Sequence, residues 1–344
     1  MLALAQTAEG LVVEARDQDL RVVGRRAFGV TALAAAVAAS GARWVLTPEG
    51  ARRLDAELAL SPPVREPEDE GLELRALTCV DDDLLLLRQH PLRGAMAPAM
   101  LSRIGANGAV RWVARLPPTS VAHPGVRSSR RRRRAWSPTT WLHAAVSLTV
   151  SGDRALVTLG DMPRSGIGVG FVISSRHGEI VFTTAAGPID QVAGLDDGRF
   201  LVAYEGYGDF DTLRYGRDGR VEDAWASHGF YVVDGTDLRV VETRGSTASK
   251  SHLARLESGG RVRRGAELPG YYTSPPLVRA DGSLIFVRAG QVFFCRDLEV
   301  IETTIISGAD ARSSAFECVA AGESTFVPVK TSSRALELLR IEVD

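Results

Sequence analysis

A repeat protein built almost entirely of β-strands is the fold class that this sequence predicts, and three observations support it. A turn signature of a turn residue, glycine, any residue and a β-branched residue recurs, with its glycines at 108, 178, 219 and 260. The last two intervals are each 41 residues, and the first becomes comparable once an insertion at 119–140 is set aside. Strand-like runs flank the turns. A period near 40 residues made only of strands is typical of β-propeller blades with four strands each.

Each repeat contains a second turn upstream of the first, rich in Asp and Gly. Asp-Gly between apolar runs favours a tight hairpin, because glycine tolerates the positive φ that such a turn requires. A mostly-β propeller of about six blades, with seven as the alternative, is therefore expected. The blades fall at residues 72–116, 142–186, 189–226, 229–267, 275–305 and 313–343.

Residues 1–60 do not repeat, and the sequence predicts a small αβ segment there. Two strands, Leu11–Ala15 and Leu20–Val23, are expected to precede an Ala-rich helix near 28–40 and a second helix after Thr47. Thr47 suits a helix N-cap, and the proline after it suits the first helical turn.

Residues 61–71 are rich in Pro and Glu and predict a linker to the propeller of residues 72–344. The last predicted blade ends after its third strand. Because an open sheet edge invites aggregation, either N-terminal strand is a candidate to complete that blade.

Composition indicates an ordinary soluble protein, with a formal net charge of -1 and 45% hydrophobic residues. The three cysteines lie in strand-like runs without metal-binding spacing, so buried thiols are expected, with no metal and no cofactor. No apolar run reaches the roughly 20 residues that span a bilayer. A cytoplasmic location is expected. The alternative is export, since Arg25-Arg26 before an Ala-rich stretch resembles a twin-arginine signal.

The predicted strand order separates the connections into two ends of each blade. Tight turns at one end are rich in Asp, whereas the longer loops at the other end are richer in cations and aromatics. The insertion at 119–140 belongs to this cationic end and contains five consecutive arginines. Arg donates two parallel hydrogen bonds to carboxylate or phosphate, so this end is the predicted binding surface. Its candidate residues are Arg93, Arg127, Arg130, Arg131, Arg132, Arg133, Arg134, Trp136, Arg164, Tyr207, Arg244, Lys250, Tyr271 and Tyr272.

Catalytic motifs of the GxSxG, HExxH or EF-hand type do not occur, so no catalytic residue is assigned and a non-enzymatic protein is expected. His90, His123 and His228 fall on predicted loops of the cationic end. They leave open a hydrolase or lyase with its site at the mouth of the central channel.

The run Leu101–Trp112, echoed by Leu213–Val221, resembles the repeats of PQQ-like and WD-like bacterial β-propellers over about residues 70–344. This resemblance implies the fold and carries no cofactor residue with it. A small αβ unit before a propeller also resembles the propeller component of bacterial MoxR–vWA ternary conflict systems. That resemblance implies a recognition role beside an ATPase partner.

The function predicted from sequence is a non-catalytic scaffold that recognises a protein partner with an acidic surface through its cationic loops. The alternatives are the propeller enzyme and nucleic-acid binding through the arginine run. The near-neutral net charge disfavours nucleic acid, which usually requires a broad basic field.

Overall fold

The structure is a computed structural model of the 344-residue chain. It describes residues 2–7, 10–17, 21–38, 40–64, 71–89, 99–117, 120–121, 140–141, 144–160, 168–185, 187, 189–205, 210–227, 229–234, 237–243, 250–269, 276–279, 281–288, 291–305, 319–321, 324–330 and 336–341. The chain forms two compact units. The first comprises Met1–Tyr204 and Tyr215–Val221, and the second comprises Glu205–Arg214 and Glu222–Asp344.

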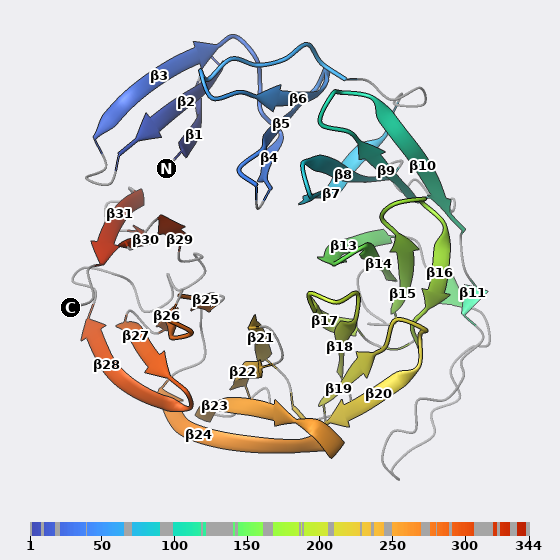
Figure 1. Ribbon diagram of the computed structural model, residues 1–344, viewed down its shortest axis with the longest axis vertical. Coiled ribbons are helices and arrows are strands. Elements are labelled where there is room, and N and C mark those ends of the chain that lie inside the picture. Colours follow the sequence, from blue (N-terminus) through green and yellow to red (C-terminus); the bar gives the residue numbers. More distant parts are fainter. Residues whose placement is uncertain are drawn as a thin grey trace. The chain divides into compact units, whose positions relative to one another are not determined.

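The chain is a β-propeller. Its described residues form five four-stranded sheets, three three-stranded sheets and one two-stranded sheet (Figure 1). The strands pair antiparallel with their neighbours in the chain, as in β7–β8 and β8–β9. First strands of consecutive sheets contact one another, β4 with β7 and β7 with β13 in the first unit, and β21 with β25 in the second.

The six blades predicted after residue 72 are confirmed as six successive sheets. Their strands are β7 (Glu73–Val80), β8 (Asp83–Gln89), β9 (Ala99–Ile104), β10 (Val110–Leu116), β13 (Ala144–Ser151), β14 (Arg154–Gly160), β15 (Gly168–Ser174), β16 (Ile180–Thr183), β17 (Ile189–Gly194), β18 (Phe200–Glu205), β19 (Phe210–Tyr215), β20 (Val221–Trp225), β21 (Gly229–Asp234), β22 (Asp237–Thr243), β23 (Lys250–Glu257), β24 (Arg261–Pro269), β25 (Leu277–Val278), β26 (Leu284–Arg288), β27 (Gln291–Arg296), β28 (Glu299–Ile305), β29 (Val319–Ala321), β30 (Ser324–Lys330) and β31 (Leu336–Ile341).

The N-terminal segment differs from its prediction, because its described residues contain no helix. They form two further three-stranded sheets. These contain β1 (Leu2–Thr7), β2 (Gly10–Arg16), β3 (Val22–Phe28), β4 (Ala34–Val37), β5 (Arg43–Thr47) and β6 (Gly50–Leu54).

The predicted helix near 28–40 was wrong because β4 pairs with β5, from Ala34 opposite Leu46 to Val37 opposite Arg43. The helix predicted after Thr47 was wrong because Thr47 closes a tight turn, where its hydroxyl donates to the Gly50 carbonyl at 2.9 Å. Gly50 adopts a φ of 135°, which a helix does not contain.

The sheet β4–β6 behaves as a blade. Isolated bridges join Ala51 to Val64 and Leu54 to Leu60, so the chain after β6 runs along the sheet in the place of a fourth strand. Part of the predicted linker therefore belongs to this sheet. Of the two candidate strands for completing the last blade, Leu20–Val23 lies partly in β3, which pairs with β2, and its role in closing the ring stays a prediction. The other, Leu11–Ala15, lies in β2 and pairs with β1 and β3 on its two edges. It therefore has no free edge for another sheet.

Packing on both faces explains the apolar run Leu84–Leu87 in β8, whose four side chains are fully buried. Leu85 and Leu87 join the cluster that contains Val157 and Phe171 of the next sheet. The alternate side chains of Leu84 and Leu86 pack with Trp44, Leu46 and Ala51 of the N-terminal sheet. Period-two alternation places successive side chains on opposite faces, so the run lies between two sheets.

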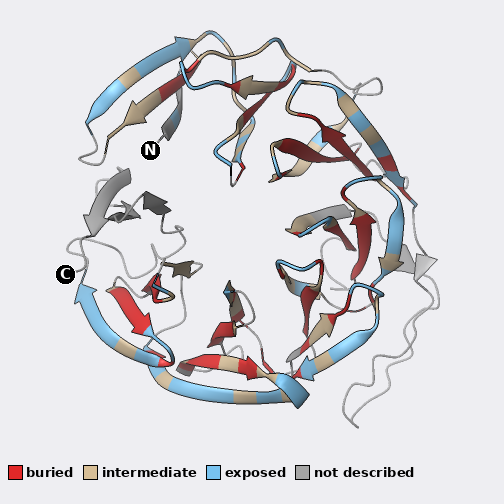
Figure 2. Ribbon diagram, viewed as in Figure 1, coloured by how far each residue is buried: buried red, intermediate tan, exposed pale blue. Residues whose placement is uncertain are grey.

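In the four-stranded sheets, burial falls toward the fourth strand (Figure 2). All residues of β8 and β9 are buried, whereas β10 alternates and β28 is almost wholly exposed. The middle strands thus form the core, and the fourth strands form an exposed edge of their sheets.

Consecutive sheets are joined by a repeated contact in which a late strand reaches the turn before the fourth strand of the next sheet. The Trp112 indole of β10 donates to the Ser175 carbonyl at 3.0 Å, and the Trp225 indole of β20 donates to the Glu257 carbonyl at 2.6 Å. In the N-terminal sheets, Arg53 donates to the Ala106 carbonyl at 3.1 Å. The N-terminal sheet β4–β6 is therefore joined to the next sheet by the same kind of hydrogen bond as the predicted blades.

Candidate functional site

The binding residues predicted from sequence lie outside the described residues, apart from Lys250, which begins β23. The structure shows the base of the arginine insertion, where β11 (Ser120–Val121) pairs with β12 (Thr140–Trp141). Arg130–Arg134 lie between these two strands in the chain. The three loop histidines, His90, His123 and His228, also lie outside the described part. Recognition of an acidic partner or of nucleic acid through these loops stays a prediction.

The turn end of each sheet is the end where tight turns join the first to the second strand and the third to the fourth. Its Asp residues were expected to make it acidic, but arginines pair with them. The paired residues are Asp81, Asp83, Asp153, Asp197, Asp218, Asp234, Asp237, Asp281 and Asp297. The charge of these turns is therefore largely compensated.

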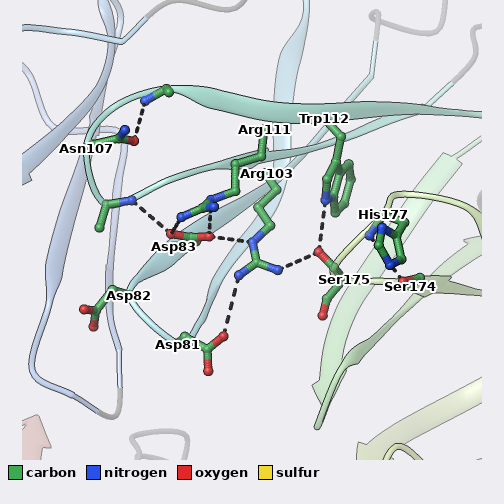
Figure 3. A network of polar contacts seen from close by, with 12 residues as sticks. Asp81, Asp82, Asp83, Arg103, Asn107, Arg111, Trp112, Ser174, Ser175 and His177 are labelled. Atoms are coloured by element: carbon green, nitrogen blue, oxygen red, sulfur yellow. Dashed lines mark hydrogen bonds and ion pairs between the residues drawn. The ribbon is translucent and has the colours of Figure 1, made fainter.

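Figure 3 shows the most buried of these pairs, where Arg103 and Arg111 converge on Asp83. The Nε atoms of both arginines lie 2.6 Å from Asp83 Oδ2, and the Ala106 amide donates to Oδ1 at 2.9 Å. Arg103 also donates to the Ser175 carbonyl of the next sheet at 2.7 Å. Because the carboxylate is saturated by donors, this network holds two blades together and offers no free group for chemistry.

A second polar cluster lies at the loop end of the sheet β21–β24, the end opposite the tight turns. Gly229, Glu242, His252 and Glu267 are successive cross-strand partners from β21 to β24. Directly opposite residues present their side chains on the same face. The row therefore brings two carboxylates and an imidazole together, next to the position where β22 ends and β23 begins.

Arg264 of β24 fixes the buried member of this row. Its Nε donates to Glu242 Oε2 at 2.6 Å and its Nη2 donates to Oε1 at 2.8 Å. The Glu242 side chain is 1% exposed, and the pKa of Arg264 is raised by its hydrogen bond to Glu242. A bidentate pair of this kind sets the orientation as well as the charge of the carboxylate.

Two buried polar atoms at this end lack a hydrogen-bond partner among the described residues. They are the Ser227 hydroxyl oxygen and the Nδ1 of His252. The other atoms in this state within the described residues are all guanidinium nitrogens. Burying such a group without a partner costs about 1–3 kcal/mol, so its retention in a fold calls for an explanation, and catalysis is one.

Hydroxyl groups adjoin Ser227. The Thr212 hydroxyl of β19 donates to the Ser227 carbonyl at 2.5 Å, and the Tyr231 hydroxyl lies 2.6 Å from the Thr212 oxygen. Thr212 is fully buried. The cluster, defined as Thr212, Ser227, Tyr231, Glu242, His252, Arg264 and Glu267, thus contains the groups used for proton transfer and for nucleophilic attack. We call it the loop-end cluster.

Metal and thiol chemistry have no support in the described part of the chain. No three His, Cys, Asp or Glu side chains there gather closely enough to hold a metal ion. Burial raises the pKa of Cys79 to about 11, with a contribution from Asp82, and burial raises the pKa of Cys295 to about 12. A thiol with so high a pKa is a poor nucleophile near neutral pH.

No helix within the described residues has the length and apolarity needed to span a membrane.

The loop-end cluster was missed in the sequence because its members come from five strands and from the link that precedes β21. Glu242 and His252 are ten residues apart in the chain, with no motif that links them. The available signal was a polar residue, Glu242 or His252, beside the apolar residues of each strand. Only the strand register shows that the two residues face each other.

Comparison with known proteins gives structural matches alone, because no family model and no curated protein matches the chain. A puromycin hydrolase S511A mutant complexed with PGG is 13% identical, with a TM-score of 0.51, and the match covers 95% of this chain and 56% of that one. The chain therefore spans little more than half of that protein.

Two further structural matches have lower TM-scores. The periplasmic gluconolactonase of Pseudomonas aeruginosa is 12% identical, with a TM-score of 0.49, and the match covers 100% of this chain and 99% of that one. The β-propeller domain of the Trilobed protease from Pyrococcus furiosus is 9% identical, with a TM-score of 0.41, and the match covers 79% of this chain and 93% of that one. At these identities the matches show the fold. The PQQ-like, WD-like and MoxR–vWA resemblances remain predictions.

The expectation that the chain is not an enzyme is corrected by this comparison. A hydrolase is among the solved structures that match nearly the whole chain. The expectation rested on the absence of short catalytic motifs. Such motifs are a poor guide for this fold, because a propeller assembles its sites from strands far apart in the sequence.

Proposed function

We propose that this β-propeller is a hydrolase whose reaction takes place at the loop end of the sheet β21–β24. One observation carries the proposal: the Nδ1 of His252 is buried without a partner among the described residues, on the strand position directly opposite Glu242. The match to a puromycin hydrolase shows the fold alone and makes this class of reaction the first to test.

In the proposed reaction, His252 serves as the general base. Its Nδ1 accepts a proton from a water molecule as the water oxygen attacks the carbonyl carbon of an ester or amide. The imidazolium then returns the proton to the leaving oxygen or nitrogen as the carbon–heteroatom bond breaks.

The carboxylates act on the histidine in this proposal. Glu242 is the cross-strand partner of His252, so its carboxylate lies on the same face of the sheet as the imidazole. Arg264 keeps Glu242 in place through its two hydrogen bonds. Glu242 and Arg264 are thus positioning residues, whereas His252 touches the reacting atoms.

The test is a panel of chromogenic esters, lactones and aminoacyl amides, assayed with the full chain and with His252→Gln. Removal of a general base should lower kcat by about 10²-fold or more. His177→Gln is the matched control, because His177 is exposed in a turn at the opposite end of its sheet and should leave kcat unchanged. A wild-type protein that hydrolyses no member of the panel, or a His252→Gln variant with full activity, would overturn the proposal.

A further inference from the structure

A groove of about 950 Å³ lies between the fourth strands of two consecutive sheets in the second unit. Arg263, Arg264 and Glu267 of β24 contribute to one wall, and Val300 and Ile301 of β28 contribute to the other. The turn Arg296–Glu299 forms its end. This volume is within the range of small-molecule sites, about 300–1,000 Å³.

The two walls are held at a fixed separation. The Ala266 amide of β24 donates to the Leu298 carbonyl at 2.7 Å. Beside it, a Cβ on Gly265 would lie 2.2 Å from the same carbonyl oxygen, so only glycine permits this approach. The groove is therefore a built feature of the junction between these two sheets.

A row of three arginines leads into the groove. Arg239, Arg255 and Arg263 are successive cross-strand partners on β22, β23 and β24. Like charges directly opposite each other are destabilising unless counter-charges separate them. Asp237 supplies one between the first two, with its oxygens 3.2 Å from Arg239 Nε and 2.8 Å from Arg255 Nε.

Arg263, the last arginine of the row, has no ion pair with a carboxylate among the described residues, and its side chain lines the groove. The facing turn adds a second arginine, Arg296. This side chain is 63% exposed and has one contact with Asp281, at 3.4 Å. Arg263 and Arg296 therefore both line the groove, one from β24 and one from the facing turn.

The carboxylates of the groove leave a place for an anion. Asp297 faces Arg255 at 3.6 Å, and Glu299 is the hairpin partner of Arg296. Glu267 lies toward the loop end, opposite His252 in the strand register. Asp237 and Glu242 pair with two of the four arginines that line the groove, Arg255 and Arg264, which leaves Arg263 and Arg296 to meet a ligand.

We propose that the turn end of this groove binds a small oxyanion ligand, carboxylate or phosphate, between Arg263 and Arg296. Both anions match the planar fork of a guanidinium group, which donates two parallel hydrogen bonds. The ligand supplies a negative charge next to Arg263, as Asp237 does between Arg239 and Arg255. The groove shares Arg264 and Glu267 with the loop-end cluster, but the proposed site uses Arg263 and Arg296, and its ligand need not be the substrate.

The competing explanation is that these arginines only protect the exposed edge of β24 from pairing with other chains. Charged residues on edge strands have that role in many sheets. It predicts aggregation of variants without any ligand binding by the wild type.

Calorimetric titration of the full chain at low salt with succinate, with glycerol phosphate and with inorganic phosphate tests the proposal. The double variant Arg263→Ser/Arg296→Ser should lose about tenfold or more in affinity for whichever anion binds. The control Arg261→Ser/Arg220→Ser removes the same charge from exposed arginines that do not line the groove, and should bind as the wild type does.

Binding should also weaken as salt is raised, because the pairs are partly exposed. Binding of succinate alone identifies a carboxylate site, and binding of either phosphate probe identifies a phosphate site. No binding of any probe by the wild type overturns the proposal. So does equal affinity in the groove variant and the control.

Discussion

At the residue scale, single buried groups decide where this protein can perform chemistry. Asp83 and Glu242 are both almost wholly buried and both contact arginines, yet their neighbourhoods differ. Asp83 is surrounded by donors that belong to two blades. Glu242 is held by Arg264 and lies opposite His252, whose buried Nδ1 has no hydrogen-bond partner among the described residues. The first arrangement is that of a structural pair, and the second is the one on which the proposed reaction rests.

The described cysteines provide a test of burial at this scale. In a Cys318→Ser variant, which removes the cysteine outside the described residues, Cys79 and Cys295 should react with DTNB very slowly at pH 7.5. Raised pKa values of about 11 and about 12 keep both thiols protonated there. Reactivity should rise at higher pH and on unfolding in denaturant. Fast labelling of the native protein at pH 7.5 would show that these side chains are not buried as described.

Asp281 shows the opposite shift. Hydrogen bonds from the Ser283 hydroxyl and amide lower the pKa of Asp281 to about 2, with smaller contributions from nearby arginines. A depressed folded-state pKa contributes stability above the ordinary Asp value of about 3.9, and that contribution is lost as pH falls toward 2. This carboxyl therefore stays ionised and paired with the turn in all conditions near neutral pH.

At the element scale, the junctions between sheets depend on an aromatic side chain that meets a glycine. A Cβ on Gly178 would lie 2.8 Å from the Trp112 ring, and a Cβ on Gly219 would lie 2.8 Å from the Phe182 ring. Both glycines sit in the repeating turn signature, and both adopt positive φ. The spacing of these glycines in the sequence therefore marks where each sheet meets its neighbour.

Gly178→Ala should lower the free energy of unfolding by about 2 kcal/mol or more, because it combines strained φ with a clash against Trp112. Gly41→Ala is the matched control. Gly41 has a similar positive φ of 89°, but no heavy atom lies within 4 Å of the position that a Cβ would occupy there. It should cost about 1 kcal/mol from backbone strain alone. Equal losses in urea unfolding would mean that the contact with Trp112 contributes nothing.

The strand pattern of the six later sheets was predictable from sequence, whereas the N-terminal sheets were not. Turn signals such as Asp197-Gly198 and Asp218-Gly219 consist of neighbouring residues, so the hairpins that they form can be predicted from the local sequence alone. In the N-terminal segment, Thr47-Pro48 suits either a helix start or a tight turn. Pairing of β5 with β4 and β6 decides between the two, and that pairing is a tertiary effect.

At the scale of the whole molecule, the N-terminal segment is part of the propeller. Trp44, Leu46 and Ala51 cover the faces of Leu84 and Leu86, and Leu11 and Val13 pack in turn on Val45 and Leu54. An apolar side chain buried in this way contributes about 1.5–3 kcal/mol. The segment thus completes the core of the first predicted blade.

Deletion of residues 1–64 should therefore expose Leu84, Leu86 and Ile104 and yield an aggregated or unfolded protein. Size-exclusion chromatography and circular dichroism would show it. A monodisperse truncation with the thermal stability of the full chain would contradict the role assigned to this segment. The double variant Trp44→Ala/Leu46→Ala is a milder check and should lower the melting temperature without removing any strand.

The loop-end cluster could not be derived from the sequence because it depends on the packing of whole sheets. Thr212, Ser227, Tyr231 and His252 come from β19, from the link to the next sheet and from two strands of that sheet. Their juxtaposition depends on how one sheet packs on the next. Local patterns predict sheets and turns, but they do not contain that packing.

The measurement that tests the central claim most directly is the rate of hydrolysis by the wild-type chain beside His252→Gln, over pH 5 to 9, on the best substrate of the panel. We predict turnover by the wild type and a loss of about 10²-fold or more in the variant. Equal rates for the two proteins across this range, or no turnover by the wild type, would contradict it.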